Sequence, residues 1–118
     1  MSQSASQATK FYEEVAVHRK VWTIRDAGGF PAPLNSEGVR SQPFWSSLSR
    51  VEITINNVPA YSGFEPVEIS WETFAQRWVP GLSKDGILVG VNWSGKNATG
   101  YDLAPDLVKK YVESHIAT

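Results

Sequence analysis

The chain has 118 residues, of which 42% are hydrophobic, 19% charged and 12% aromatic, which predicts one globular domain and excludes a disordered or fibrous chain. Eleven Lys and Arg residues are interspersed with twelve Asp and Glu residues, so no basic surface for nucleic acid or an anionic membrane is expected. Cysteine is absent, which excludes disulfides, thiolate metal ligands and a cysteine nucleophile.

The first residues and the hydropathy pattern bear on location. Residues 1–9 are mostly Ser, Gln, Ala and Thr, without the apolar centre of an export signal. No apolar run reaches the roughly 18 residues that a membrane-spanning helix requires. We therefore expect a cytoplasmic protein without a membrane segment. We also expect a single domain over residues 1–118, with a flexible N-terminal end over residues 1–7.

Two elements are expected in the first 30 residues. Apolar side chains spaced three and four residues apart between Ala8 and Ala16 predict a helix over residues 4–18. The β-branched and aromatic residues that follow predict a strand over 20–26. A turn at 27–29 closes this strand, and a hairpin partner is expected to begin at Phe30.

The segment from 31 to 57 gives weaker signals. Three prolines and a glycine predict a loop over residues 31–43, with room for one short edge strand near Val39. Residues 46–57 alternate like a strand but also fit helical spacing. Ser49, with Glu52 three residues later, forms a capping box that favours the helix.

The next segment has clearer periodicity. A short strand is expected over residues 66–70, followed by a helix that Ser70 caps and that ends at Pro80-Gly81. The apolar run within residues 86–93 predicts the central strand of the sheet. A turn is expected at 94–97.

The last elements complete the predicted fold. A short strand is expected over residues 99–103, and Pro105 opens a final amphipathic helix. The order of elements predicts an α+β fold, a single compact domain in which three or four helices pack on a small, mostly antiparallel sheet.

Motifs that carry chemistry are incomplete. The loop from Gly90 to Asn97 is one residue short of a phosphate-binding P-loop, since Asn97 stands where Ser or Thr would reach the magnesium ion. His18 and His115 lie at expected helix ends without carboxylates at ligand spacing. No Ser occupies a Gly-X-Ser-X-Gly elbow. The sequence therefore predicts no cofactor and no metal, and it favours a binding protein over an enzyme.

Five tryptophans are the compositional excess of the chain. Trp71 and Trp78 share one face of the expected helix and are predicted to be core residues. Trp45 and Trp93 lie at the edges of expected elements, beside polar residues. They either plug the ends of the core or leave their indole N–H groups for a partner. The candidate binding surface comprises Trp45, Arg50, Asn92, Trp93, Lys96 and Tyr101.

Several separated motifs point to a known family. They are Pro43-Phe44-Trp45-Ser46, Trp78-Val79-Pro80-Gly81 and Gly90-Val91-Asn92-Trp93. With these motifs the chain resembles a family of small bacterial proteins of unknown function, over residues 11–102. The resemblance implies a bacterial, cytoplasmic, stand-alone domain with no established activity, cofactor or catalytic residue.

Three functions are compatible with these observations. The first is a non-catalytic binding module for a protein partner, such as an immunity-like neutraliser or a regulatory subunit. The second is a small-molecule-binding protein or enzyme with a pocket near Trp45 and Trp93, which a deep apolar pocket with converging polar groups would favour. The third is a self-associating structural protein, so a monomer or a homodimer is expected.

Overall fold

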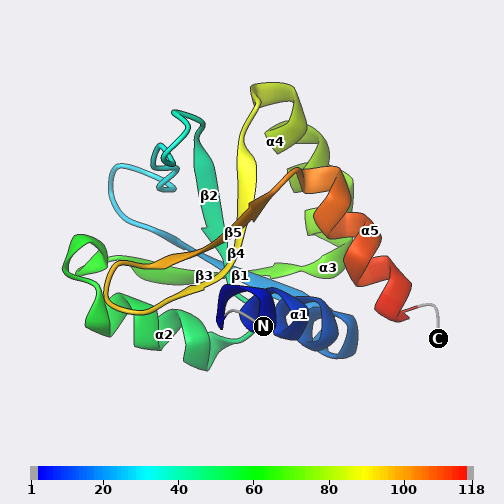
Figure 1. The fold of residues 1–118 in the computed structure, drawn as a ribbon, viewed down its shortest axis with the longest axis horizontal. Coiled ribbons are helices and arrows are strands. Elements are labelled where there is room, and N and C mark those ends of the chain that lie inside the picture. Colours follow the sequence, from blue (N-terminus) through cyan, green and yellow to red (C-terminus); the bar gives the residue numbers. More distant parts are fainter. Residues whose placement is uncertain (1–2, 117–118) are drawn as a thin grey trace.

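The order and packing of helices and strands give an α+β fold, as the sequence predicts (Figure 1). The computed structural model describes residues 3–116. Its elements are α1 (Gln3–His18), β1 (Lys20–Arg25), β2 (Ser41–Phe44), α2 (Leu48–Asn57), η1 (Pro59–Tyr61), β3 (Glu65–Ser70), α3 (Trp71–Thr73), η2 (Phe74–Trp78), α4 (Val79–Asp85), β4 (Leu88–Ser94), β5 (Thr99–Leu103) and α5 (Pro105–Ile116). No helix in this part of the chain is long and apolar enough to cross a membrane.

Two small sheets form the framework, and most of their pairings are antiparallel, as predicted. β1 pairs antiparallel with β3. In the other sheet β4 is central, as expected, and lies parallel to β2 and antiparallel to β5. Trp22 of β1 and Trp45, directly after β2, exchange backbone N–H···O bonds of 2.8 and 2.7 Å. This pair of hydrogen bonds joins the two sheets.

The predicted hairpin partner of β1 at Phe30 is wrong. Asp26 and Gly29 exchange backbone hydrogen bonds of 3.1 and 3.0 Å, so the chain turns directly after β1. In the described part of the chain, the segment after this turn forms no hairpin strand with β1, because its prolines lack the N–H that a ladder needs. β3 takes the place beside β1 instead. The short strand expected near Val39 begins at Ser41.

The prediction of a helix within residues 46–57 is confirmed by α2. The expected capping box is wrong, because the helix begins two residues earlier than a cap at Ser49 requires. Ser47 is the N-cap residue, and its hydroxyl accepts a hydrogen bond from the backbone N–H of Arg50 at 3.3 Å. This arrangement satisfies one of the N–H groups that the first helical turn leaves without a partner.

The prediction that the next helix ends at Pro80-Gly81 is also wrong. Ser70 caps it as expected, accepting a hydrogen bond from Thr73 N at 3.1 Å, but the helix continues through η2 and α4 to Asp85. η2 is a π-helical turn, in which Val79 N–H bonds the carbonyl of Phe74. A proline ring normally clashes with the carbonyl four residues earlier. The wider turn just before Pro80 changes that register, so the helix passes the proline.

Apolar side chains form two cores. The main core comprises Ala8, Phe11, Val15, Val21, Phe44, Ile69, Trp71, Phe74, Val79, Leu82, Val89, Val91, Val108 and Val112. The small core comprises Ile24, Trp45, Val51, Val58, Tyr61, Trp93 and Ala98. Trp71 is buried in the main core and Trp78 packs against it partly buried, so the prediction for these two tryptophans is confirmed. In Figure 1, α4 and α5 lie to the right of β4, and α2 lies to the lower left.

Candidate functional site

A pocket of about 370 Å³ lies beside the small core, where α2 meets the tip of the β4–β5 hairpin and the start of α1. We call it the Trp93 pocket. All of the candidate residues except Tyr101 line it. The lining residues are Gln7, Trp45, Arg50, Ile53, Thr54, Asn57, Asn92, Trp93, Ser94, Gly95 and Lys96.

Trp93 owes its position to two glycines and a β-bulge. The register of β4 and β5 shifts between Val91 and Ser94, and Asn92 within this bulge has a left-handed φ of 49°. The indole of Trp93 lies on the backbone of both strands. A Cβ on Gly90 would collide with its six-membered ring, and one on Gly100 would lie 2.9 Å from its Cδ1. Within the motif from Gly90 to Trp93, the glycine and the bulge therefore leave the space that the indole ring occupies.

The two tryptophans of the pocket are buried, with 1% of Trp45 and 7% of Trp93 exposed. Trp45 Nε1 donates to the carbonyl oxygen of Trp93 at 2.9 Å, and Trp93 Nε1 donates to Asp102 Oδ1 at 3.0 Å. Of the two alternatives for these residues, the one with indole N–H groups free for a partner is wrong, because both groups are already bonded. These residues plug the core and form the inner wall of the pocket.

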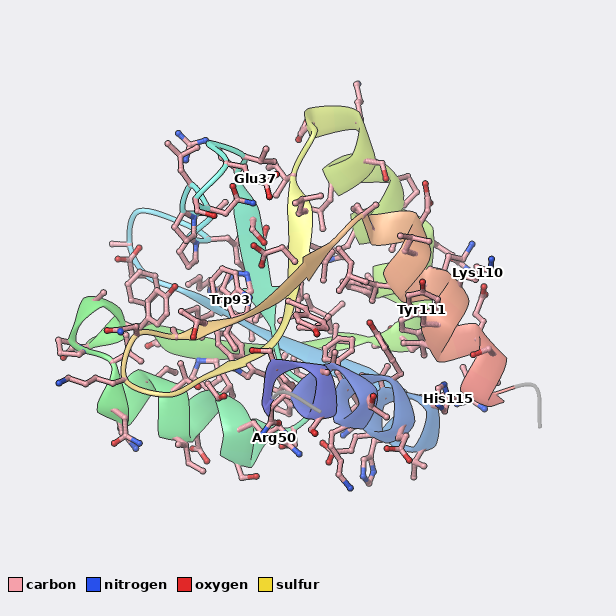
Figure 2. All side chains as sticks on the ribbon, in the orientation of Figure 1. Glu37, Arg50, Trp93, Lys110, Tyr111 and His115 are labelled. Carbon is pink, nitrogen blue, oxygen red and sulfur yellow. The ribbon has the colours of Figure 1, made fainter. Side chains whose placement is uncertain are left out.

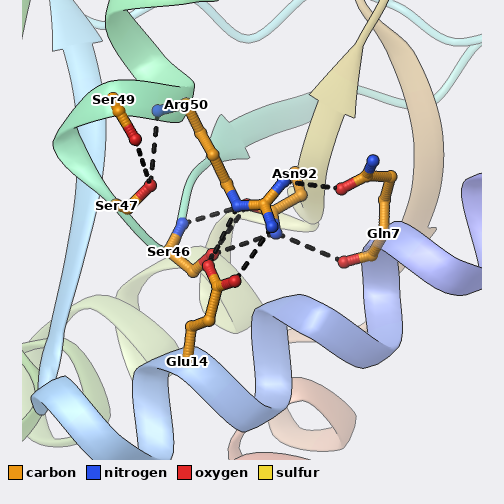
Figure 3. A network of polar contacts seen from close by, with 7 residues as sticks. All are labelled: Gln7, Glu14, Ser46, Ser47, Ser49, Arg50 and Asn92. Atoms are coloured by element: carbon orange, nitrogen blue, oxygen red, sulfur yellow. Dashed lines mark hydrogen bonds and ion pairs between the residues drawn. The ribbon is translucent and has the colours of Figure 1, made fainter.

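Arg50 ties α2 to α1 (Figure 3). Its Nε and Nη2 atoms donate to Glu14 Oε1 and Oε2, both at 2.9 Å, and its Nη1 donates to Gln7 Oε1 at 2.8 Å. The hydrogen bond from Arg50 lowers the pKa of Glu14, against the opposing effect of burial. A bidentate pair of this kind fixes both partners. Arg50 therefore brings little uncompensated charge to the pocket that it lines.

Gln7 lies in the segment predicted to be a flexible end, residues 1–7. Residues 3–7 form the start of α1, close to the expected helix start at residue 4, and residues 1 and 2 lie outside the described residues. The carbonyl oxygen of Gln7 accepts a hydrogen bond from Asn92 Nδ2 at 3.2 Å, so the bulge of β4 holds this part of α1 against the pocket.

Asn92 and Ser46 bond one another at the base of this network. Asn92 Oδ1 accepts from Ser46 N at 2.9 Å, and Asn92 Nδ2 donates to Ser46 Oγ at 3.0 Å. Ser46 Oγ in turn donates to Glu14 Oε1 at 2.6 Å. Buried polar groups need such partners to avoid a large desolvation cost. Asn92 thus acts as a brace, with its amide committed to protein atoms.

The remaining polar side chains at the pocket are available. Lys96 is exposed in the turn between β4 and β5, and it forms no ion pair with any of residues 3–116. The side chains of Asn57 and Ser94 make no hydrogen bond within the same residues. The pocket therefore combines a braced inner wall with unpartnered polar groups at its mouth.

Tyr101 does not belong to the pocket. Gly100 and Asp102 face Trp93, and because side chains alternate along a strand, Tyr101 faces the other way. It lies near Tyr12. Burial, together with the nearby Tyr111 and Tyr101, raises the pKa of Tyr12 to about 12. The rings of Tyr12 and Tyr111 also contact in a tilted arrangement, with 5.3 Å between their centroids. Figure 2 shows Tyr111 on α5, away from Trp93.

Sequence reasoning missed part of the lining. Ile53, Thr54 and Asn57 fall on one face of α2, and the favoured helix over 46–57 implied that grouping. Nothing in the sequence pointed to Gln7. Among residues 3–116, no group of three or more His, Cys, Asp or Glu side chains is placed to hold a metal ion.

The fold and the pocket define a small α+β domain with a ligand-sized cavity beside a tryptophan-lined core. The chain belongs to the family described as "Protein of unknown function (DUF2750)", whose model matches residues 8–111. This confirms the resemblance to a family of unknown function. No curated protein matches the sequence.

One solved structure that the comparison finds is Tic22 from Anabaena, described as a protein-transport protein. The two chains align with a TM-score of 0.41 and 14% identity, over 75% of this chain and 46% of the Tic22 chain. This chain therefore spans less than half the length of Tic22.

Proposed function

We propose that this chain is a non-catalytic binding protein whose ligand is a small molecule held in the Trp93 pocket. The observation that carries the proposal is the pocket itself. Its volume of about 370 Å³ falls within the range of roughly 300–1,000 Å³ that is usual for small-molecule sites. Apolar walls from Ile53 and the buried tryptophans combine with polar groups from three separate elements, as such sites require.

The chemistry of the lining supports binding rather than catalysis. Among the described residues that line the pocket, none is Asp, Glu, His or Cys, the side chains that most often act as general acids, bases or nucleophiles. The hydroxyls of Thr54 and Ser94 have no such group beside them in this lining. The family membership and the motifs also lead us to propose a bacterial, cytoplasmic protein.

Nuclear magnetic resonance of the tryptophan indole N–H groups tests this proposal. A set of metabolite-sized compounds is titrated into the labelled protein. We expect binders to shift the signals of Trp45 and Trp93 and to leave that of Trp71, in the main core, unchanged. The proposal fails if no compound moves the two pocket signals.

A matched pair of variants tests the location. Ile53 lines the pocket and is 59% exposed, whereas Val17 is 74% exposed on α1 and lies outside it. Removing the apolar contact with Ile53→Ser should weaken binding roughly tenfold, a loss of about 1.4 kcal/mol. Val17→Ser should leave binding unchanged. Equal binding by both variants would place the ligand elsewhere.

A protein partner is the second candidate, and exposed aromatic residues on the other side of β5 favour it. Tyr101 is 44% exposed and Tyr111 37% exposed, and both lie near Tyr12. Tyrosine is enriched in protein interfaces. Labelled protein is titrated with fractionated bacterial proteins. Shifts at Tyr101 and Tyr111, without shifts at Trp45 and Trp93, would favour a partner on this face.

A further inference from the structure

We infer that the ligand of the Trp93 pocket is a small organic anion, bound through its charged group at Lys96 and through its apolar part at Ile53. This inference rests on the proposed function and adds the chemical class of the ligand. The two residues belong to different elements, Ile53 to α2 and Lys96 to the turn between β4 and β5.

The charged side chains that line the pocket favour an anionic ligand. The charged side chains among the described lining residues are Arg50 and Lys96, and no carboxylate lines the pocket. Glu14 neutralises Arg50 through two hydrogen bonds of 2.9 Å. Lys96 has no ion-pair partner within residues 3–116. The pocket therefore keeps one uncompensated positive charge at its mouth, which an anionic group would balance.

The neutral groups at the mouth are consistent with an anion. Asn57 and Ser94 line the same pocket, and their side chains can donate hydrogen bonds that no described residue accepts. Donors aimed at an ionised acceptor form stronger hydrogen bonds than neutral pairs. Lys96, Asn57 and Ser94 thus form a set of donors without a competing carboxylate.

The apolar wall argues for an organic ligand rather than a bare ion. Ile53 lines the pocket and is mostly exposed, and Trp45 and Trp93 close the inner end. An inorganic ion would leave this surface in water. A molecule with both a charged group and an apolar body would cover it, which adds favourable free energy in proportion to the buried area.

Matched pairs of compounds test the inference. Indole-3-acetate and 4-methylbenzoate are each compared with the corresponding primary amide, and inorganic phosphate serves as the bare ion. Each is titrated while the indole N–H signals of Trp45 and Trp93 are followed. We expect each carboxylate to bind at least tenfold more tightly than its amide, and phosphate to bind more weakly than either carboxylate.

A charge variant assigns the effect to Lys96. Lys96→Gln should weaken carboxylate binding about tenfold and leave amide binding unchanged. Lys84→Gln, which removes an exposed lysine of α4 outside the pocket, is the control and should change neither.

The outcomes separate the inference from the proposed function. Equal binding of carboxylates and amides, or carboxylate binding that Lys96→Gln leaves intact, overturns the anionic ligand while the pocket remains a binding site. Phosphate binding as tight as carboxylate binding overturns the organic part of the inference. Failure of all these compounds, together with no hit in the wider set of metabolite-sized compounds, overturns both.

Discussion

The main core and the small core of this protein are built differently. Among the described residues, the main core is the larger, with fourteen buried apolar residues against seven in the small core, and α1, α4 and α5 close it over the strands. The small core is rich in tryptophan and tyrosine, and buried polar residues such as Thr54, Ser46 and Asn92 lie beside it. A densely packed apolar region contributes most of the stability of a domain. Where hydrogen-bonded polar side chains hold the backbone in place, a pocket can persist, and here it is the Trp93 pocket.

The largest expected effect is a cavity in the main core. Phe74 is fully buried and packs against Phe44 and Trp71, with ring centroids 5.0 and 5.6 Å away. Phe74→Ala should lower the free energy of unfolding by about 3–5 kcal/mol, because the lost contacts leave a cavity that cannot fully collapse. Urea unfolding followed by circular dichroism measures it. A loss below about 1.5 kcal/mol would show that the main core is looser than its burial indicates.

A second variant removes the space that Gly90 leaves for the ring of Trp93. Gly90→Ala places a Cβ against the indole ring, so the ring must move, at a cost of about 1–3 kcal/mol. Tryptophan fluorescence should change with it. Gly81→Ala is the control, since nothing lies within 4 Å of that Cβ, and it should stabilise α4 by about 0.5–1 kcal/mol. Equal effects of the two variants would contradict the proposed seating.

The third prediction concerns the bridge between α1 and α2 and depends on pH. The pKa of Glu14 is lowered below its ordinary value of 4.5 by Arg50. Its ionised form therefore stabilises the fold above pH 4.5, and this contribution is lost as the pH falls through the lowered value. Glu14→Gln should cost about 1 kcal/mol at pH 7 and less at pH 3, as urea unfolding at both values would show.

The exposed neighbour Glu13 supplies the control for this pH dependence. It is on α1 beside Glu14, and its carboxylate takes part in no ion pair with residues 3–116. Glu13→Gln should have little effect at either pH. A cost for Glu14→Gln that is the same at pH 3 and pH 7 would argue against the ion pair with Arg50.

The smallest effect is expected at the wall of the pocket. Ile53 is mostly exposed on α2, so Ile53→Ser should change the free energy of unfolding by no more than about 0.5 kcal/mol. Thermal unfolding of the unliganded protein measures it. Together with the predicted loss of binding, this result would separate stability, set in the main core, from recognition. A loss above about 1.5 kcal/mol would show that Ile53 contributes to stability as well as to recognition.

Most of the helices could be predicted from the sequence, because apolar periodicity reports which face of a helix is buried. The wrong predictions concern features that contacts between distant parts of the chain determine. The partner of β1 is β3, which local turn signals at 27–29 cannot reveal. The predicted helix ended at Pro80 because proline usually breaks a helix. The π turn that lets the real helix pass Pro80 is not visible in helix propensity.

The candidate site was predictable to the extent that it is local in sequence. Trp45, Asn92 and Trp93 stood out because their neighbours are glycine and polar residues at element edges. The β-bulge that places Trp93 beside Gly100 was not visible, so the side of the sheet on which Tyr101 lies could not be assigned. Gln7 joins the pocket only through the fold of α1.

The parallel pairing of β2 with β4 has a consequence for how the chain folds. Residues 45–87, with α2, β3 and α4, lie between these two strands. Parallel neighbours cannot be joined by a tight turn, so this pairing must wait until the intervening segment has closed a long loop, an entropically slow step. Trp45 follows β2 and Trp93 lies in β4. The wall of the pocket therefore forms only when this long loop closes, together with the pairing of β2 and β4.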